Sequence, residues 1–179
     1  MIEEIRKRIN ETDDALRSLL VQRMGLSLEV AECKRGMGET TVYRPEREKA
    51  ILKAGSAFVA PDEREAYTAA MRGVMAASRM LQYDRMARWH GEAVDALFEG
   101  PVPEDAKGVR ARFQADAGML AVFLSVAGER GVRVTQARLH EDGACDLTIL
   151  GDVSSAPFRS LLYQMAKESA GFTAALILD

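Results

Sequence analysis

Apolar positions in the first 100 residues recur at the three- and four-residue steps of an amphipathic helix. In residues 1–44 the stripe consists of Ile5, Ile9, Thr12, Leu16, Leu19, Leu20, Leu26 and Val30. In residues 62–100 a comparable stripe consists of Tyr67, Met71, Val74, Leu81 and Trp89. Between them, residues 45–55 begin with proline and end at glycine, which is typical of a short helix. The pattern predicts three helices, of which the first and third are long.

A different pattern follows residues 99–108, where turn-forming residues are concentrated and which we interpret as a linker. Alternating or continuous apolar runs predict strands at 109–115, 131–139, 146–153 and 172–178, with helices at 118–129 and 156–169. The order βαββαβ predicts a ferredoxin-like sheet with two helices on one face. We therefore expect a helical domain at 1–98 and an α+β domain at 109–179.

Composition narrows the functional classes. The 179 residues are 47% hydrophobic and 28% charged, as in ordinary globular domains. Residues 1–98 contain sixteen Lys and Arg and sixteen Asp and Glu, and the remaining residues contain eight Lys and Arg and eleven Asp and Glu. Neither part is therefore a basic nucleic-acid surface. No apolar run approaches the roughly 18 residues of a membrane span, and the first residues lack a signal-peptide pattern. We expect a cytoplasmic protein without nucleic-acid or membrane partners. Two histidines and two cysteines suggest no metal site.

Polar residues interrupt the apolar stripes of the predicted helices. At 100° per residue, Arg23 and Lys34 lie about 20° apart within the first stripe. Inward positions on the other two helices are Arg47, Glu48, Ser78 and Gln82. Buried charges are costly unless paired, so these residues indicate ion pairs or an anionic ligand inside the bundle. The alternative is that the two cations extend to solvent, or pair with Glu29 or Glu48.

The length of the first helix points to a second subunit. A helix over residues 2–35 is about 50 Å long, which exceeds the width of a small domain. Such a helix would bury its stripe against a second copy, giving an intertwined homodimer. Because Arg6 is about 26 Å from Arg23 along the axis, Arg6 can serve the same ligand only from the other subunit.

These residues, in this order, resemble the all-helical chorismate mutases, especially the mutase domain of bifunctional chorismate mutase and prephenate dehydratase enzymes. The resemblance covers roughly residues 2–90. It is carried by the segments 5–9, 22–24, 29–34 and 43–48, together with Ser78 and Gln82. It implies chorismate as the substrate, prephenate as the product and a place in aromatic amino-acid biosynthesis. It also implies that no cofactor is needed, because the pericyclic rearrangement uses no nucleophile, general acid, metal or redox group.

The resemblance further implies a role for each polar residue. Arg23 and Arg47, with Arg6 from the second subunit, match groups that hold the two carboxylates of chorismate. Ser78 matches a side chain near one carboxylate. Where some members carry an aspartate that contacts the ring hydroxyl, this chain has Arg44. Lys34 and Gln82 match the pair that contacts the ether oxygen and the carboxylate near it. Glu48 matches the residue that accepts a hydrogen bond from the ring hydroxyl.

Residues 109–179 resemble an ACT domain, the amino-acid-sensing βαββαβ module of many biosynthetic enzymes. Residues 116–120 fall at the turn from the first strand into the first helix, where Gly118 allows close approach of a ligand. The resemblance implies a regulatory or dimerisation domain, with an aromatic amino acid as candidate effector. Of the signature that sensors of this kind carry after the second strand, the chain retains the arginine, Arg138. The alternative is a domain that mainly dimerises or docks to another enzyme.

Two other functions stay open at this stage. An isochorismate pyruvate-lyase uses the same helical fold and a similar cationic site, although the complete set of Lys34, Glu48 and Gln82 favours the mutase. A non-catalytic helical dimer could instead act as an allosteric partner of a shikimate-pathway enzyme. The cations at 23 and 34 disfavour that reading, because a purely structural bundle would be more stable with apolar residues there.

Overall fold

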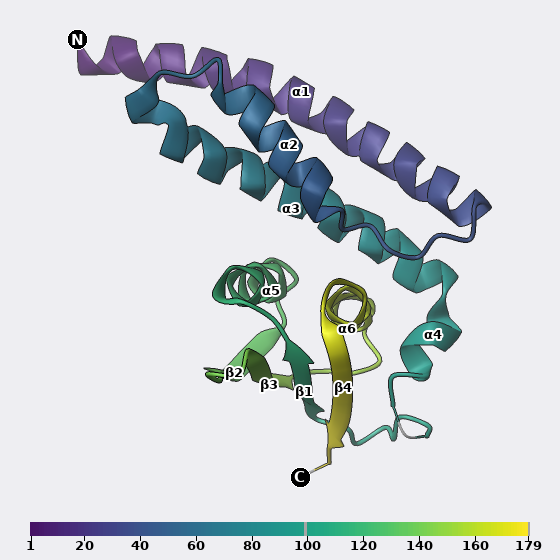
Figure 1. Cartoon of the computed structure of the whole chain (residues 1–179). Coiled ribbons are helices and arrows are strands. Elements are labelled where there is room, and N and C mark those ends of the chain that lie inside the picture. Colours follow the sequence, from purple (N-terminus) through teal and green to yellow (C-terminus); the bar gives the residue numbers. More distant parts are fainter. Residues whose placement is uncertain (99, 179) are drawn as a thin grey trace.

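A computed structural model describes residues 1–98 and 100–178 (Figure 1). The helical region, residues 1–98, contains α1 (Ile2–Gly36), α2 (Pro45–Ser56), the 3-10 turn η1 (Pro61–Glu63), α3 (Arg64–Trp89) and α4 (Gly91–Asp95). The sheet region, residues 108–178, contains β1 (Gly108–Gln114), α5 (Ala117–Glu129), β2 (Arg133–Leu139), β3 (Ala144–Leu150), α6 (Ala156–Glu168) and β4 (Ala170–Ile177). Glu99, where the expected linker begins, and Asp179, where the expected second domain ends, lie outside the described residues.

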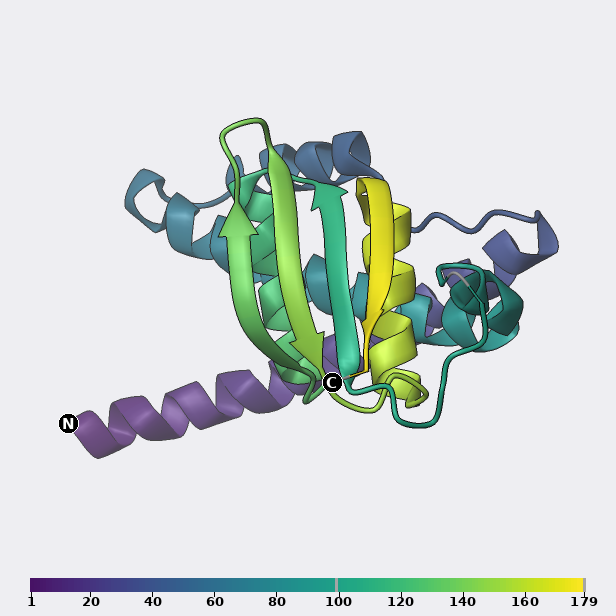
Figure 2. The same ribbon diagram turned by 90° about the horizontal axis from the view of Figure 1, so that it is seen from below.

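The sheet region confirms the predicted order of strands and helices. Its four strands pair antiparallel in the order β2-β3-β1-β4. Both helices, α5 and α6, cover the same face, and the opposite face is uncovered (Figure 2). Along the central strand β1, Val109, Ala111 and Phe113 are buried while the alternating residues from Arg110 to Gln114 are exposed, so one face points into the core. There the Phe113 ring meets the Phe123 ring of α5 edge-on, with centroids 5.4 Å apart.

Helix α3 is the middle layer of the molecule (Figure 1). One of its sides contacts α1 and α2, and the other contacts α5 and α6. Its buried residues are Met75, Ser78, Arg79, Gln82, Tyr83, Met86 and Ala87. The ring of Tyr83 packs edge-on against that of Tyr163 on α6, with centroids 6.1 Å apart. The sheet region therefore completes the core of the helical region, and the expected division at residue 98 crosses a shared core.

The third predicted helix is shorter than the proline-free segment 62–100 allows. It ends at Trp89, His90 leaves the helical conformation, and Gly91 begins the short α4. Glycine lowers the propensity to continue a helix, and the carbonyl of Gly91 accepts a hydrogen bond from the sheet region. Arg159 at the start of α6 donates to that carbonyl at 3.0 Å and to Asp95 at 2.8 Å. The turn thus directs the chain towards the sheet, where Phe98 joins the core.

The apolar stripe of α1 is not buried within one chain. Among the described residues, α1 buries only Ser27 and Ala31. Ile9 is 51% exposed, Leu16 48% and Leu19 63%, and the N-terminal part of α1 projects away from the rest of the chain (Figure 2). No described helix combines the length and apolarity required to cross a bilayer. An exposed apolar surface of this extent is typical of a protein interface.

The hydroxyl of Tyr83 should matter for stability. It accepts hydrogen bonds from the backbone N–H of Val42 at 3.1 Å and of Tyr43 at 3.3 Å. Tyr83→Phe removes this acceptor, and an unsatisfied buried donor costs about 1–3 kcal/mol. We expect a decrease of that size in the free energy of unfolding, measured by urea denaturation. Tyr163→Phe is the matched control, since the buried Tyr163 hydroxyl has no partner among the described residues. Equal losses in both variants would contradict this explanation.

Candidate functional site

A cavity of about 520 Å³ lies between α1, α2 and α3. It brings together six of the seven side chains that the sequence singled out, although they come from three helices. Those six are Arg23, Lys34, Arg47, Glu48, Ser78 and Gln82. The seventh, Arg6, is exposed near the N-terminus of α1, where it pairs with Glu3 and does not line the cavity. A single chain therefore assembles all of the predicted site except Arg6.

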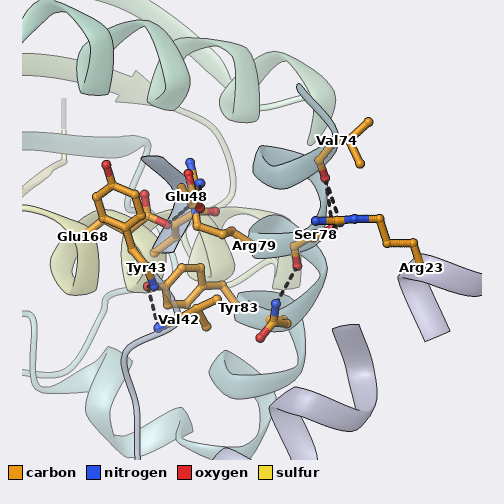
Figure 3. A network of polar contacts seen from close by, with 11 residues as sticks. Arg23, Val42, Tyr43, Glu48, Val74, Ser78, Arg79, Tyr83 and Glu168 are labelled. Atoms are coloured by element: carbon orange, nitrogen blue, oxygen red, sulfur yellow. Dashed lines mark hydrogen bonds and ion pairs between the residues drawn. The ribbon is translucent and has the colours of Figure 1, made fainter. Parts of the chain in front are cut away.

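Arg23 joins α1 to α3 at one end of the cavity (Figure 3). Its Nη1 donates to the hydroxyl of Ser78 and, at 3.3 Å, to the carbonyl of Val74. The Ser78 hydroxyl in turn donates to the same carbonyl at 2.9 Å. A guanidinium in this position retains further N–H groups, so it can bind a carboxylate while still contacting α3.

Lys34 lies near the other end of α1. Its Nζ donates to the carbonyl of Thr41 at 2.6 Å and lies 3.8 Å from a carboxylate oxygen of Glu39. Burial lowers the pKa of Lys34, the nearby charge of Arg44 lowers it further, and Glu39 opposes both. The side chain is only 11% exposed, so it does not extend into solvent. The alternative pairing with Glu29 or Glu48 is also wrong, because the neighbouring carboxylate is that of Glu39.

Gln82 and Arg47 have hydrogen-bonding capacity that the described residues do not use. The buried amide oxygen of Gln82 has no partner there, while its Nε2 donates to the carbonyl of Ser78 at 3.3 Å. Arg47 is exposed at the cavity edge and forms no ion pair with another described residue. Unsatisfied buried polar atoms are rare in folded proteins, so the Gln82 amide indicates a place where a ligand atom can bind.

Glu48 is the carboxylate of α2 that borders the cavity, and it forms an ion pair with Arg79 of α3 (Figure 3). The Nε of Arg79 also donates to Glu168 of α6 at 3.1 Å. The guanidinium carbon lies 4.8 Å from the centre of the Tyr43 ring. Burial alone would lower the pKa of Arg79, but the charges of Glu168 and Glu48 outweigh it and raise this pKa. One buried cation therefore joins α2, α3 and the sheet region.

Sequence reasoning missed several members of this site. Glu39 and Arg79 also line the cavity, and so does Arg44, which the sequence had identified only as a departure from the family pattern. Arg79 directly follows Ser78, but treating the third helix as a helix with one buried face left this position on the solvent side. Arg44 and Glu39 lie in or next to a connection without periodicity, and they pair at 2.7 Å. The signal that could have identified Arg79 is the second buried face of α3, which depends on distant residues.

The electrostatics of the cavity favour a small anion. Five cationic side chains and two carboxylates line it: Arg23, Lys34, Arg44, Arg47 and Arg79, with Glu39 and Glu48. Arginines bind carboxylates with two parallel hydrogen bonds, whereas lysine supplies a compact charge to one oxygen. Among the described residues, no group of three metal-ligating side chains lies together. The arrangement is suited to holding a dicarboxylate with its remaining polar atoms near Lys34 and Gln82.

A comparison with known families matches part of the helical region. Residues 5–83 match the family model for chorismate mutase type II. The matched segment includes every predicted site residue, from Arg6 to Gln82, whereas the sheet region lies outside it. No curated protein and no solved structure matches the chain.

The lowered pKa of Lys34 can be measured directly. We expect Lys34 to lose its proton at a lower pH than an ordinary lysine, as followed by NMR of its side-chain nuclei. Arg44→Ala should raise this pKa, since it removes a repelling charge and frees Glu39 to approach the ammonium group. Arg17→Ala is the control, because Arg17 pairs with Asp14 on the surface of α1 and lies about 25 Å along that helix from Lys34. An unchanged Lys34 titration in Arg44→Ala would contradict the assigned cause.

Proposed function

We propose that this chain is a chorismate mutase that converts chorismate to prephenate in the biosynthesis of phenylalanine and tyrosine. The observation that carries the proposal is the convergence of Arg23, Lys34, Arg47, Glu48, Ser78 and Gln82 on one cationic cavity. These residues lie within the segment that matches the chorismate mutase type II family. The combination of dicarboxylate-binding arginines with a buried lysine and amide suits this substrate.

The proposed chemistry requires position and charge, not a covalent intermediate. In the rearrangement, the ether carbon–oxygen bond breaks while a carbon–carbon bond forms within the same molecule. The protein must hold the dianion in a compact conformation that brings the reacting carbons together. Arg23 and Arg47 would hold its carboxylates. Lys34 would donate to the ether oxygen, which gains negative charge as its bond breaks, and Gln82 would donate to it through the Nε2 hydrogen that Ser78 does not use.

Glu48 has a separate proposed task. Chorismate carries a ring hydroxyl, and the ionised Glu48 can accept its hydrogen bond at the edge of the cavity. Since Arg44 replaces the aspartate that some family members use for this hydroxyl, and here pairs with Glu39, its recognition would depend on Glu48. This contact would orient the ring relative to the carboxylates held by Arg23 and Arg47.

We propose that the active form is a homodimer whose subunits exchange Arg6. The exposed stripe along α1, including Ile5, Ile9 and Leu16, is the surface that a second copy would cover. Two-fold symmetry makes such a contact reciprocal, so each α1 would place its N-terminal part against the other subunit. Arg6 would then add a cation to a cavity that already contains Arg23 and Arg47.

The sheet region would act as an ACT-like regulatory unit for an aromatic amino acid. A second cavity, of about 480 Å³, lies where this region meets α2 and α3. Its lining includes Asp116, Gly118 and Met119, at the turn from β1 into α5 that the sequence singled out. Leu52 and Val122 add apolar surface, so the cavity combines apolar and charged walls, as an amino acid with a large side chain would require.

The proposed activity is tested by supplying chorismate to the purified chain without a cofactor and detecting prephenate. Lys34→Ala should lower kcat at least about a hundredfold, because it removes a preorganised donor to the ether oxygen. Arg23→Ala should also raise KM strongly, since it removes binding of a carboxylate. Lys53→Ala, which removes an exposed lysine from α2, is the control and should be unchanged. Absence of prephenate would overturn the proposal, and release of pyruvate from isochorismate would identify a lyase instead.

The shared site can be tested with mixed dimers. Arg6→Ala and Arg23→Ala chains should each be nearly inactive alone. Co-expressed with different affinity tags and purified as mixed dimers, they should regain about half of the wild-type activity per dimer, because one of the two sites is then intact. Mixed dimers as inactive as their parents would contradict exchange of Arg6 between subunits, as would full activity of Arg6→Ala alone.

A further inference from the structure

We propose that Arg79 is a positioning residue that orients Glu48 for catalysis, and that Glu168 of the sheet region sets this orientation from the opposite side. The inference rests on the proposed function, because Glu48 is the group that would accept the substrate hydroxyl. In this proposal, Arg79 and Glu168 control the contact that Glu48 makes with the substrate. Glu168 lies outside the matched segment 5–83.

Arg79 is fixed from three directions. Its side chain is 8% exposed and begins on α3, one residue after Ser78 and three before Gln82. Nη1 donates to Glu48, Nε donates to Glu168, and the guanidinium lies over the ring of Tyr43. A planar guanidinium can contact two carboxylates through different edges at once, which the single ammonium group of lysine cannot do in this geometry.

The position of the Glu48 carboxylate depends mainly on its ion pair with Arg79. In the described part of the chain, Arg79 is the one cation within ion-pairing distance of its carboxylate. Helix α2 contains no fully buried residue, so apolar packing restrains it only weakly. The ion pair to Arg79 therefore supplies much of what holds the Glu48 carboxylate in place. Displacement of a binding group by about 1 Å can lower a rate by orders of magnitude.

Glu168 is held more firmly than Glu48. Its side chain is 2% exposed, and burial raises its pKa while Arg79 lowers it. Gln164, on the same face of α6, donates to Glu168 at 3.1 Å and accepts from Arg130 at 3.0 Å. Arg130 returns to α3 through an ion pair of 2.7 Å with Asp84. This closed network fixes the sheet side of Arg79, so a movement of α6 must change how the guanidinium is shared.

The Glu48–Arg79 pair also forms a wall between the two cavities. Both residues line the candidate active site as well as the second cavity, whereas Glu168 lines only the second cavity. An occupant of the second cavity would contact the guanidinium directly. Binding in the sheet region and the orientation of Glu48 are thereby joined through one side chain, without a change in the fold.

The test is a double-mutant cycle on kcat/KM for chorismate. Arg79→Lys keeps the buried charge but cannot hold both carboxylates, and it should lower kcat/KM roughly tenfold. Glu168→Gln should lower kcat/KM roughly threefold or more, because the guanidinium of Arg79 then has Glu48 as its one carboxylate partner among the described residues and is no longer held from the side of α6. In a Glu48→Gln background, both changes should alter kcat/KM by less than about twofold, since the group they position is gone. Equal losses in both backgrounds would overturn the proposal.

The control is another ion pair between the two regions. Arg159 on α6 contacts Asp95 and the carbonyl of Gly91, far from Glu48 along the shared interface. Arg159→Ala should leave kcat/KM within about twofold of wild type. Far-UV circular dichroism and the urea midpoint establish that each variant is folded. A loss in Arg159→Ala as large as that in Glu168→Gln would show that any weakening of the interface is sufficient, which would contradict a specific role for Glu168.

A measurement without substrate separates this inference from the proposed function. The Nε–H proton of Arg79, followed by NMR, should exchange slowly with water because it is buried and bonded to Glu168. Glu168→Gln and Glu48→Gln should each accelerate that exchange at least roughly threefold, since each removes a charge that holds the guanidinium. Acceleration in a protein that forms no prephenate would defeat the proposed function alone. An exchange rate of the Arg79 Nε–H proton that is unchanged in Glu48→Gln would contradict the positioning role, whatever the enzyme assay shows.

Discussion

A buried guanidinium must be neutralised inside the protein, and the surroundings of Arg79 follow from that requirement. Removing a charge from water is costly, and the cost is offset only where well-placed carboxylates replace the lost hydration. Arg79 obtains one carboxylate from α2 and one from α6. Neither helix can shift without leaving a charge uncompensated. The ion triad therefore fixes the distance between the candidate active site and the sheet region, as well as the position of α3 between them.

The same helix explains which features could be predicted from sequence. Amphipathic spacing sufficed for α1, and an initial proline with a terminal glycine sufficed for α2. Alternating or continuous apolar runs sufficed for the strand order of the sheet region, since all of these patterns are local. The inward positions of Ser78 and Gln82 were also visible, because they share a face with an apolar stripe. The boundaries were less accurate: β3 begins at Ala144, not at residue 146, and α3 ends at Trp89.

Other parts of the site depend on contacts that no local pattern reveals. Arg79 and Glu168 are 89 positions apart in the chain. Their pairing requires that α6 pack on the side of α3 that a three-helix interpretation leaves to solvent. Glu39 and Arg44 belong to the connection between α1 and α2, whose course is set by hydrogen bonds from Val42 and Tyr43 to Tyr83. Arg23, Lys34, Arg47 and Glu48 were therefore predictable from local patterns, whereas Arg79 and its partner Glu168 were found from the structure.

The edge-on contact between Tyr83 and Tyr163 has a consequence for how such a chain can change during evolution. Tyr83 belongs to the segment that matches a catalytic family, and Tyr163 belongs to a region outside that match. Because aromatic side chains from both regions share a core, neither region is an independent structural unit. Separation by recombination would expose Tyr83 and Met86 to water. A substitution on either side of the contact therefore changes the packing of both regions.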